Sequence, residues 1–99
     1  MPIEKHRLIT RADLDGVVCG GLLYELELID DVVFAEPNEM QTGAFPVRSS
    51  DITANLPYVP GVHHCFDHHA SEVLRVGEKD NLTIDPDAPS AARVVYDHY

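Results

Sequence analysis

Length, composition and charge already exclude several classes of protein. The chain has 99 residues, of which 44% are hydrophobic and 24% charged, and this is typical of one small globular domain rather than a disordered segment. Its formal net charge is −10 and its seven lysines and arginines are scattered. This excludes binding of duplex nucleic acid through contacts with many phosphates, because such binding needs a basic face.

The cysteines and the apolar runs predict where the protein resides. Cys19 and Cys65 lie inside apolar runs, so packing is expected of them rather than a disulfide framework. The N-terminal segment lacks the apolar core of a signal peptide, and no apolar run reaches membrane-spanning length. We therefore expect a cytoplasmic protein that has no membrane partner.

Strand and helix signals alternate along the first half of the chain. Residues 7–10 predict a strand, and the apolar residues within 15–29 fall on one face at helical spacing. Residues 32–35 predict a fully buried strand, and the polar segment 37–43 predicts one helical turn. Residues 47–58 give the least certain signal.

The second half continues the alternation less regularly. A strand is predicted over 62–66, and 71–82 is a charged connection with little periodicity. Pro89 starts a last helix, at a position where its missing N–H costs nothing. Short apolar strands joined by helices predict an α/β fold, with three α/β/α layers and a mainly parallel sheet. The strands are few and the last helix has no stop signal, so we expect the front portion of a longer protein.

Carboxylates and imidazoles follow two of the predicted strands. Asp13 and Asp15 come after the first strand, and Asp67-His68-His69 follows the strand over 62–66. In open α/β sheets the ligand crevice lies at the carboxyl ends of the strands. Hard divalent cations take carboxylate oxygen, and imidazole suits manganese, iron or zinc. The pattern therefore predicts a metal site, and bound cations would reconcile the acidic chain with a phosphate substrate.

Three segments resemble the DHH phosphoesterase superfamily, most of all its exopolyphosphatase-related branch. They read TRADLDG over 10–16, DITANLP over 51–57 and FDHHASE over 66–72, and the resemblance spans essentially the whole chain. It implies that water activated at a two-manganese centre hydrolyses a phosphoester or phosphoanhydride, with Mg²⁺ or another divalent metal as a substitute. The substrates it implies are polyphosphate, a short oligonucleotide or a cyclic dinucleotide.

The resemblance also implies a metal-ligand set. The matching residues are Asp13, Asp15, Asp51, Asp67 and His68. Within this set, Asp51 matches the carboxylate that bridges both metals. Asp67 matches a residue that either binds a metal or orients the imidazoles.

Two further residues are implied to act on the substrate. His69 matches a histidine that lies near the metals and the substrate phosphate. Many relatives carry a histidine ligand two or four residues before the position of Asp13, where this chain has Arg11 and Ile9. Arg11 cannot bind a metal because its guanidinium stays protonated, but it could clamp a phosphate. We therefore predict His69 and Arg11 as the catalytic residues.

Two parts of such an enzyme would lie beyond Tyr99: a fourth-motif aspartate, and a C-terminal domain that closes over the site and selects the substrate. We therefore expect a truncated N-terminal DHH-type domain over 1–99 that is inactive alone. A homo-oligomer is left open, because sheet edges exposed by the truncation would favour association.

Each assignment has a structural alternative. Asp13 and Asp15 could be turn and N-cap residues, and Asp51 could form an Asx-turn. The DHH histidines could be surface loop residues, and Arg11 could be an ion-pair partner. For the whole chain, the alternatives are a non-catalytic metal- or phosphate-binding regulatory module and a domain stabilised by one ion. Two bound ions would indicate catalysis and a single ion a structural role.

Overall fold

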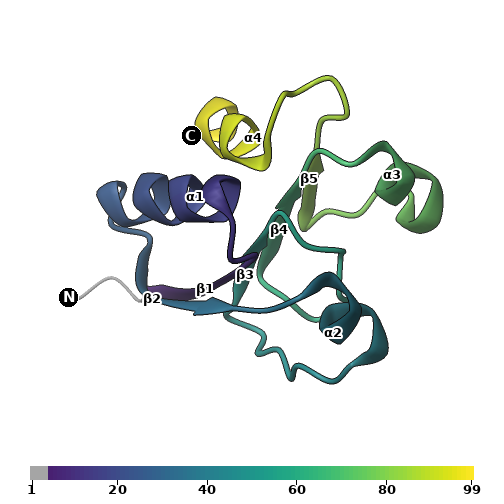
Figure 1. Ribbon diagram of the computed structural model, residues 1–99, viewed down its shortest axis with the longest axis horizontal. Coiled ribbons are helices and arrows are strands. Elements are labelled where there is room, and N and C mark those ends of the chain that lie inside the picture. The colour runs from purple at the N-terminus through teal and green to yellow at the C-terminus, as the bar shows by residue number, and fades with distance from the viewer. Residues whose placement is uncertain (1–4) are drawn as a thin grey trace.

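A computed structural model describes residues 5–99 and shows five strands that alternate with helices (Figure 1). The strands are β1 (His6–Thr10), β2 (Ile29–Phe34), β3 (Ile52–Ala54), β4 (His64–Asp67) and β5 (Leu82–Ile84). The helices are α1 (Leu14–Glu25), α2 (Pro37–Thr42), α3 (Ala70–Val76) and α4 (Ala91–His98).

The strands form one parallel sheet in the order β2-β1-β3-β4-β5. Leu8 of β1 is level with Val32 of β2 on one side and with Ile52 of β3 on the other. From β1 the chain adds β2 in one direction and β3, β4 and β5 in the other. The topological switch point therefore lies between β1 and β3. The predicted α/β class with a parallel sheet is confirmed.

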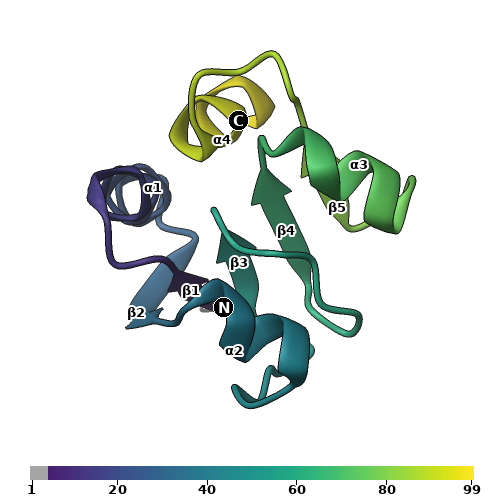
Figure 2. The same cartoon turned by 45° about the vertical axis from the view of Figure 1, so that its right-hand side comes forward.

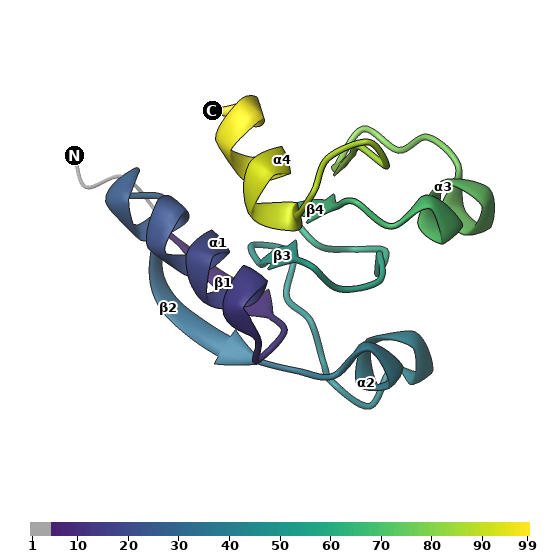
Figure 3. The same ribbon diagram turned by 45° about the horizontal axis from the view of Figure 1, so that its top comes forward.

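Helices cover both faces of the sheet and give the predicted three layers (Figures 1 and 3). α1 and α4 lie side by side on one face, where Leu8, Leu23 and Val95 are fully buried in the main core. On the other face, Met40 of α2 packs with Ile9 in a second cluster, and α3 contributes to a third. Leu8 and Ile9 belong to different clusters because successive strand residues point to opposite faces.

The boundary between α1 and β2 differs from the prediction. The helix predicted over 15–29 ends at Glu25, and Glu27 takes a left-handed φ of 61°. Ile29 already belongs to β2, which runs to Phe34 and is largely exposed. β2 lies at an edge of the sheet, so the prediction of a fully buried strand over 32–35 is wrong.

Two segments with no clear sequence pattern form regular structure. The segment 71–82, predicted as a connection, contains most of α3 and the start of β5. The uncertain segment 47–58 contains β3, whose three residues are all buried. Elements this short contain too few residues for a hydrophobic periodicity to be recognised, and a strand buried on both faces shows no alternation of apolar and polar residues.

The cysteines pack as predicted. Both are free and buried, and burial raises the pKa of the Cys19 and Cys65 thiols to about 12. Neither is therefore a thiolate nucleophile at neutral pH. Among residues 5–99, the helices are too short or too polar to cross a membrane.

Candidate functional site at the carboxyl edge of the sheet

The carboxyl ends of β1, β3 and β4 lead into three neighbouring loops (Figure 2). The loop after β1 carries Asp13, Asp15 follows in the first turn of α1, and the loop after β3 begins with Asn55. β4 ends at Asp67 and is followed directly by His68. β1 and β3 are the strands on either side of the switch point, where open α/β sheets bind their ligands.

The start of α1 shapes the first loop. Asp13 is the N-cap of α1, and its Oδ1 accepts a hydrogen bond of 2.8 Å from the backbone N of Gly16. A Cβ at Gly16 would lie 1.9 Å from the carbonyl oxygen of Arg11, so the helix can begin this close to β1 only with glycine there. The capping alternative for Asp13 is thus confirmed. Its side chain is still 40% exposed and accessible to a ligand.

Asp15 contacts a helix far along the chain. Its two carboxylate oxygens each accept a hydrogen bond of 2.9 Å, from the backbone N of Ala91 and of Ala92 at the start of α4. Free amides and the helix dipole both favour a carboxylate at this position. Asp15 therefore ties α1 to α4 while remaining partly exposed beside the imidazole of His68.

Asp67 is the buried carboxylate of the site. Its Oδ1 accepts a hydrogen bond of 2.7 Å from Nδ1 of His69. Its Oδ2 is also buried and has no hydrogen-bond partner within residues 5–99. Burial raises the pKa of the Asp67 carboxyl, and the hydrogen bond from His69 opposes that rise. A buried carboxylate oxygen that lacks a donor is suited to accept a cation.

His68 presents one ring nitrogen to the site. Its Nδ1 lies 3.2 Å from the carbonyl oxygen of Ala88, which can only accept, so Nδ1 donates in this contact and a neutral ring has its lone pair on Nε2. Nε2 lies 3.9 Å from Oδ2 of Asp15. Metal-binding histidines are commonly oriented in this way, with the second nitrogen donating to a backbone carbonyl.

His69 and Arg11 line a pocket of about 170 Å³ beside these carboxylates. Further lining residues include Gln41, Asn55, Pro57, Asp67 and Ser71. His69 is 48% exposed, and within residues 5–99 it bonds to Asp67 through Nδ1 and leaves Nε2 without a hydrogen bond. Nε of Arg11 lies 3.8 Å from Oδ2 of Asp13, a weak exposed ion pair that leaves the guanidinium available to a ligand.

Asp51 does not lie at this edge. It directly precedes β3 and so sits at the amino end of the sheet, and three strand residues advance about 10 Å. The carboxylate is fully buried, with Oδ1 3.0 Å from Nε of Arg7 and Oδ2 2.7 Å from Nη2 of Arg7. The backbone N of Arg48 donates a further bond. The structure therefore corrects the prediction that Asp51 bridges two metals: it is the partner in a structural ion pair.

Asn55 is the site residue that the motifs did not single out. It follows β3 directly, and its Nδ2 lies 3.2 Å from Oδ1 and 3.1 Å from Oδ2 of Asp13. An Asx residue that ends a buried strand in a parallel sheet is a signal that could have identified it. The resemblance drew attention to Asp51 instead, four positions earlier and at the other end of the same strand.

The carboxylate oxygens and imidazole nitrogens at this edge are the kinds of ligand atom that bind divalent cations. Within residues 5–99, Oδ2 of Asp67 lacks a partner, and Nε2 of a neutral His68 would offer a lone pair. A complete ligand set is not assembled, because no three His, Cys, Asp or Glu side chains of residues 5–99 are grouped closely enough to hold an ion. The Asp15 oxygens bind α4 amides, and those of Asp13 bind Asn55. An ion bound here would therefore compete with the α4 amides for Asp15, whereas a carboxylate has further lone pairs, so Asp13 could bind an ion while Asn55 still donates to it.

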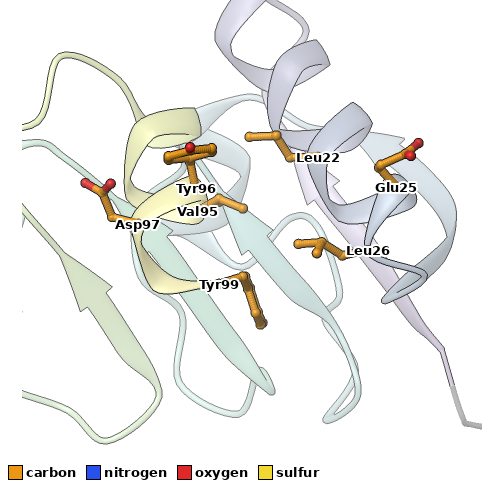
Figure 4. Close-up of a pocket in the computed structure, with 7 residues that line it drawn as sticks. All are labelled: Leu22, Glu25, Leu26, Val95, Tyr96, Asp97 and Tyr99. Carbon is orange, nitrogen blue, oxygen red and sulfur yellow. The ribbon is translucent and has the colours of Figure 1, made fainter.

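A wider groove of about 530 Å³ lies between α1 and α4 (Figure 4). Its lining residues are Leu22, Glu25, Leu26, Val95, Tyr96, Asp97 and Tyr99. The carboxylates of Glu25 and Asp97 lie on opposite sides of it (Figure 4). The residues that line it include no imidazole, thiol or basic group, so we place the candidate functional site at the carboxyl edge of the sheet.

A solved structure resembles the chain over nearly its whole length. It is described as PggH, a pGpG-specific phosphodiesterase from Vibrio cholerae. The two are 50% identical and superpose with a TM-score of 0.86 over 96% of this chain, which spans 30% of the length of that protein. No family model and no curated protein matches the chain. The chain is thus related to part of a phosphodiesterase.

Proposed function

We propose that this chain forms the metal-binding half of the active site of a phosphodiesterase that hydrolyses a short oligonucleotide such as pGpG. The observation that carries the proposal is the 50% identity to a pGpG-specific phosphodiesterase over 96% of this chain. The carboxylates and imidazoles at the carboxyl edge of the sheet support it. Because the chain spans 30% of that protein, we propose catalysis for it in combination with the remaining domain.

The metal we propose is Mn²⁺, with Mg²⁺ as an alternative. Asp13, Asp67 through Oδ2 and His68 through Nε2 would hold it. When bound, the ion would supply an activated water and positive charge for the phosphoryl oxygens. A second ion would depend on Asp15, because Asp51 lies at the opposite end of β3.

The proposed proton donor is His69. Its Nδ1 donates to Asp67, which fixes the ring and the tautomer, and the exposed ring can offer Nε2 to the substrate. General acid catalysis needs such a group within hydrogen-bond reach of the leaving oxygen. A protonated His69 would deliver a proton to that oxygen, and Asp67 would stabilise the positive charge before transfer.

Arg11 is proposed to bind the substrate phosphate. It lines the same pocket as His69, and only the exposed carboxylate of Asp13, at 3.8 Å, pairs with it within residues 5–99. A guanidinium offers two parallel N–H groups to phosphate oxygens. On a chain of net charge −10, this cation would offset part of the repulsion that a dinucleotide meets.

A non-catalytic module that binds a metal ion or phosphate is the second candidate. The observation that favours it is that no three potential ligands of residues 5–99 are grouped around one point. Such a module would bind Mn²⁺ or pGpG and leave the phosphodiester intact.

The proposal can be tested in a chimera that joins this chain to the remaining part of the Vibrio cholerae phosphodiesterase. This chain would replace the matching 30% of the Vibrio cholerae phosphodiesterase, and conversion of pGpG to GMP would be followed by chromatography with Mn²⁺ or with chelator. We expect metal-dependent hydrolysis that Asp67→Asn and His68→Ala reduce by a factor of 100 or more (~10²–10³ for lost electrostatic or ligand groups). Asp97→Asn, on the exposed face of α4, is the matched control and should have no effect.

Two outcomes would decide against hydrolysis. A folded chimera that binds pGpG without cleaving it would favour the non-catalytic module. Hydrolysis that neither Asp67→Asn nor His68→Ala changes would place the reaction elsewhere in the chimera.

A further inference from the structure

We infer that Asn55 is a positioning residue that orients the Asp13 carboxylate toward the bound cation. The inference rests on the proposed function, because it assigns to Asn55 a role in the same site.

The Asn55 side chain is fixed more firmly than its position in a loop suggests. The residue is 5% exposed, and its backbone N donates a bond of 3.0 Å to the carbonyl oxygen of Phe66 in β4. Its φ is 60°, in the left-handed region that asparagine adopts more readily than most residues. Two strands thus hold the backbone of Asn55, and the side chain has little freedom to leave the Asp13 carboxylate.

The contact with Asp13 spans both carboxylate oxygens. Nδ2 of Asn55 lies 3.2 Å and 3.1 Å from Oδ1 and Oδ2, and Gly16 holds Oδ1 from the other side through its backbone N. Donors on two sides fix the plane of the carboxylate. The chain separates these residues by 42 positions, so this orientation comes from the tertiary fold and not from the capping turn alone.

The choice of an amide at this position has an electrostatic consequence. A carboxylate in place of the amide would set two negative charges about 3 Å apart in the metal-free protein, which is strongly unfavourable. The neutral amide donates to Asp13 and keeps its orientation before an ion arrives. Asn55 therefore prepares Asp13 for the cation without adding to the charge of the site.

The test measures Mn²⁺ binding to the full 99-residue chain, by electron paramagnetic resonance of free Mn²⁺ and by the Mn²⁺-induced rise in Tm. Asn55→Gly removes the amide and tolerates the positive φ without strain. We expect its Mn²⁺ affinity to fall about 10- to 100-fold, as is usual when a group that orients a ligand is lost. Asn38→Ala, which removes an exposed amide from α2, is the matched control and should bind as the parent does.

Asn55→Asp removes the amide donor but keeps the backbone conformation, because aspartate also tolerates the left-handed region. It therefore tests the amide separately from the backbone. In this variant the cation would relieve repulsion between two carboxylates, so Mn²⁺ should raise Tm by more than in the parent. Parent-like affinity in both Asn55 variants, with Mn²⁺ bound by the parent, would reject the role of Asn55 and leave the proposed function standing. A parent chain that binds no Mn²⁺ would overturn the metal proposal and this inference with it.

Discussion

Replacing Arg7 with methionine should destabilise the protein strongly, because it leaves a buried charge without its partner. Asp51 is 0% exposed and Arg7 only 15%, and the pair shares two hydrogen bonds of 3.0 and 2.7 Å. Two unit charges about 4 Å apart attract by about 4 kcal/mol at an effective dielectric constant of about 20. Loss of one partner from a buried pair costs about 3–5 kcal/mol, and domains are stable by only about 5–15 kcal/mol.

Urea unfolding followed by circular dichroism would measure this cost. The backbone N of Arg48 still donates to Asp51 in Arg7→Met, so we expect a loss near the lower bound, about 3 kcal/mol, and a Tm lower by about 12 °C or more. The double variant Arg7→Met/Asp51→Leu should recover most of the loss, because no unpaired charge remains. Arg93→Met breaks the exposed pair with Asp97 and should cost under about 1 kcal/mol.

Two results would refute this reasoning. A cost for Arg7→Met no larger than that of Arg93→Met would show that Asp51 is not effectively buried. A double variant that folds but binds Mn²⁺ more than tenfold more weakly than the parent would return Asp51 to the ligand set, since the ion pair lies at the opposite end of β3.

Three further predictions concern the site and the pH dependence of stability. Asp13→Asn and His68→Ala should each weaken Mn²⁺ binding at least tenfold in a calorimetric titration, and parent-like affinity in both would contradict their assignment as ligands. Arg11→Lys should slow hydrolysis of pGpG by the chimera without changing Mn²⁺ affinity, because lysine lacks the bidentate fork; unaltered kinetics would reject the phosphate clamp. Burial lowers the pKa of His64 from 6.5 to about 4, so the unfolded chain takes up a proton first as the pH falls. The free energy of unfolding should therefore decrease from about pH 6.5 to pH 4 in urea titrations, and a His64→Gln variant with the same slope would rule out His64 as its source.

The sequence identified the carboxyl edge of the sheet because local signals are strong there. Asp13 is the cap of a well-marked helix, and Asp67 closes an apolar strand, so both could be placed from neighbouring residues alone. Asp51 was misplaced because β3 has only three residues, and no local pattern shows at which end of so short a strand a carboxylate lies. The partner that decides its role, Arg7, is 44 positions away.

The same limit explains why Asn55 was missed and why α3 and β5 were not predicted. The role of Asn55 depends on a contact with Asp13 across 42 positions, and a single asparagine in a loop carries no periodic signal. β5 has three residues and α3 has seven, fewer than the window over which an amphipathic pattern becomes visible. What the sequence could not supply was register and pairing, which are properties of the assembled sheet.

The bond between Asp15 and α4 also has a consequence for the order in which the chain folds. The hydrogen bonds to Ala91 and Ala92 span 76 and 77 positions, so they can form only after Ala92 has been synthesised. Synthesis at about 5–20 residues per second needs several seconds to extend the chain from Asp15 to Ala92, and the Asp15 carboxylate cannot bind α4 during that time. Contacts of such long range close late and slow folding. Docking of α4 should therefore be among the last folding steps of residues 5–99, and the Asp15 carboxylate should become ordered only when that helix docks.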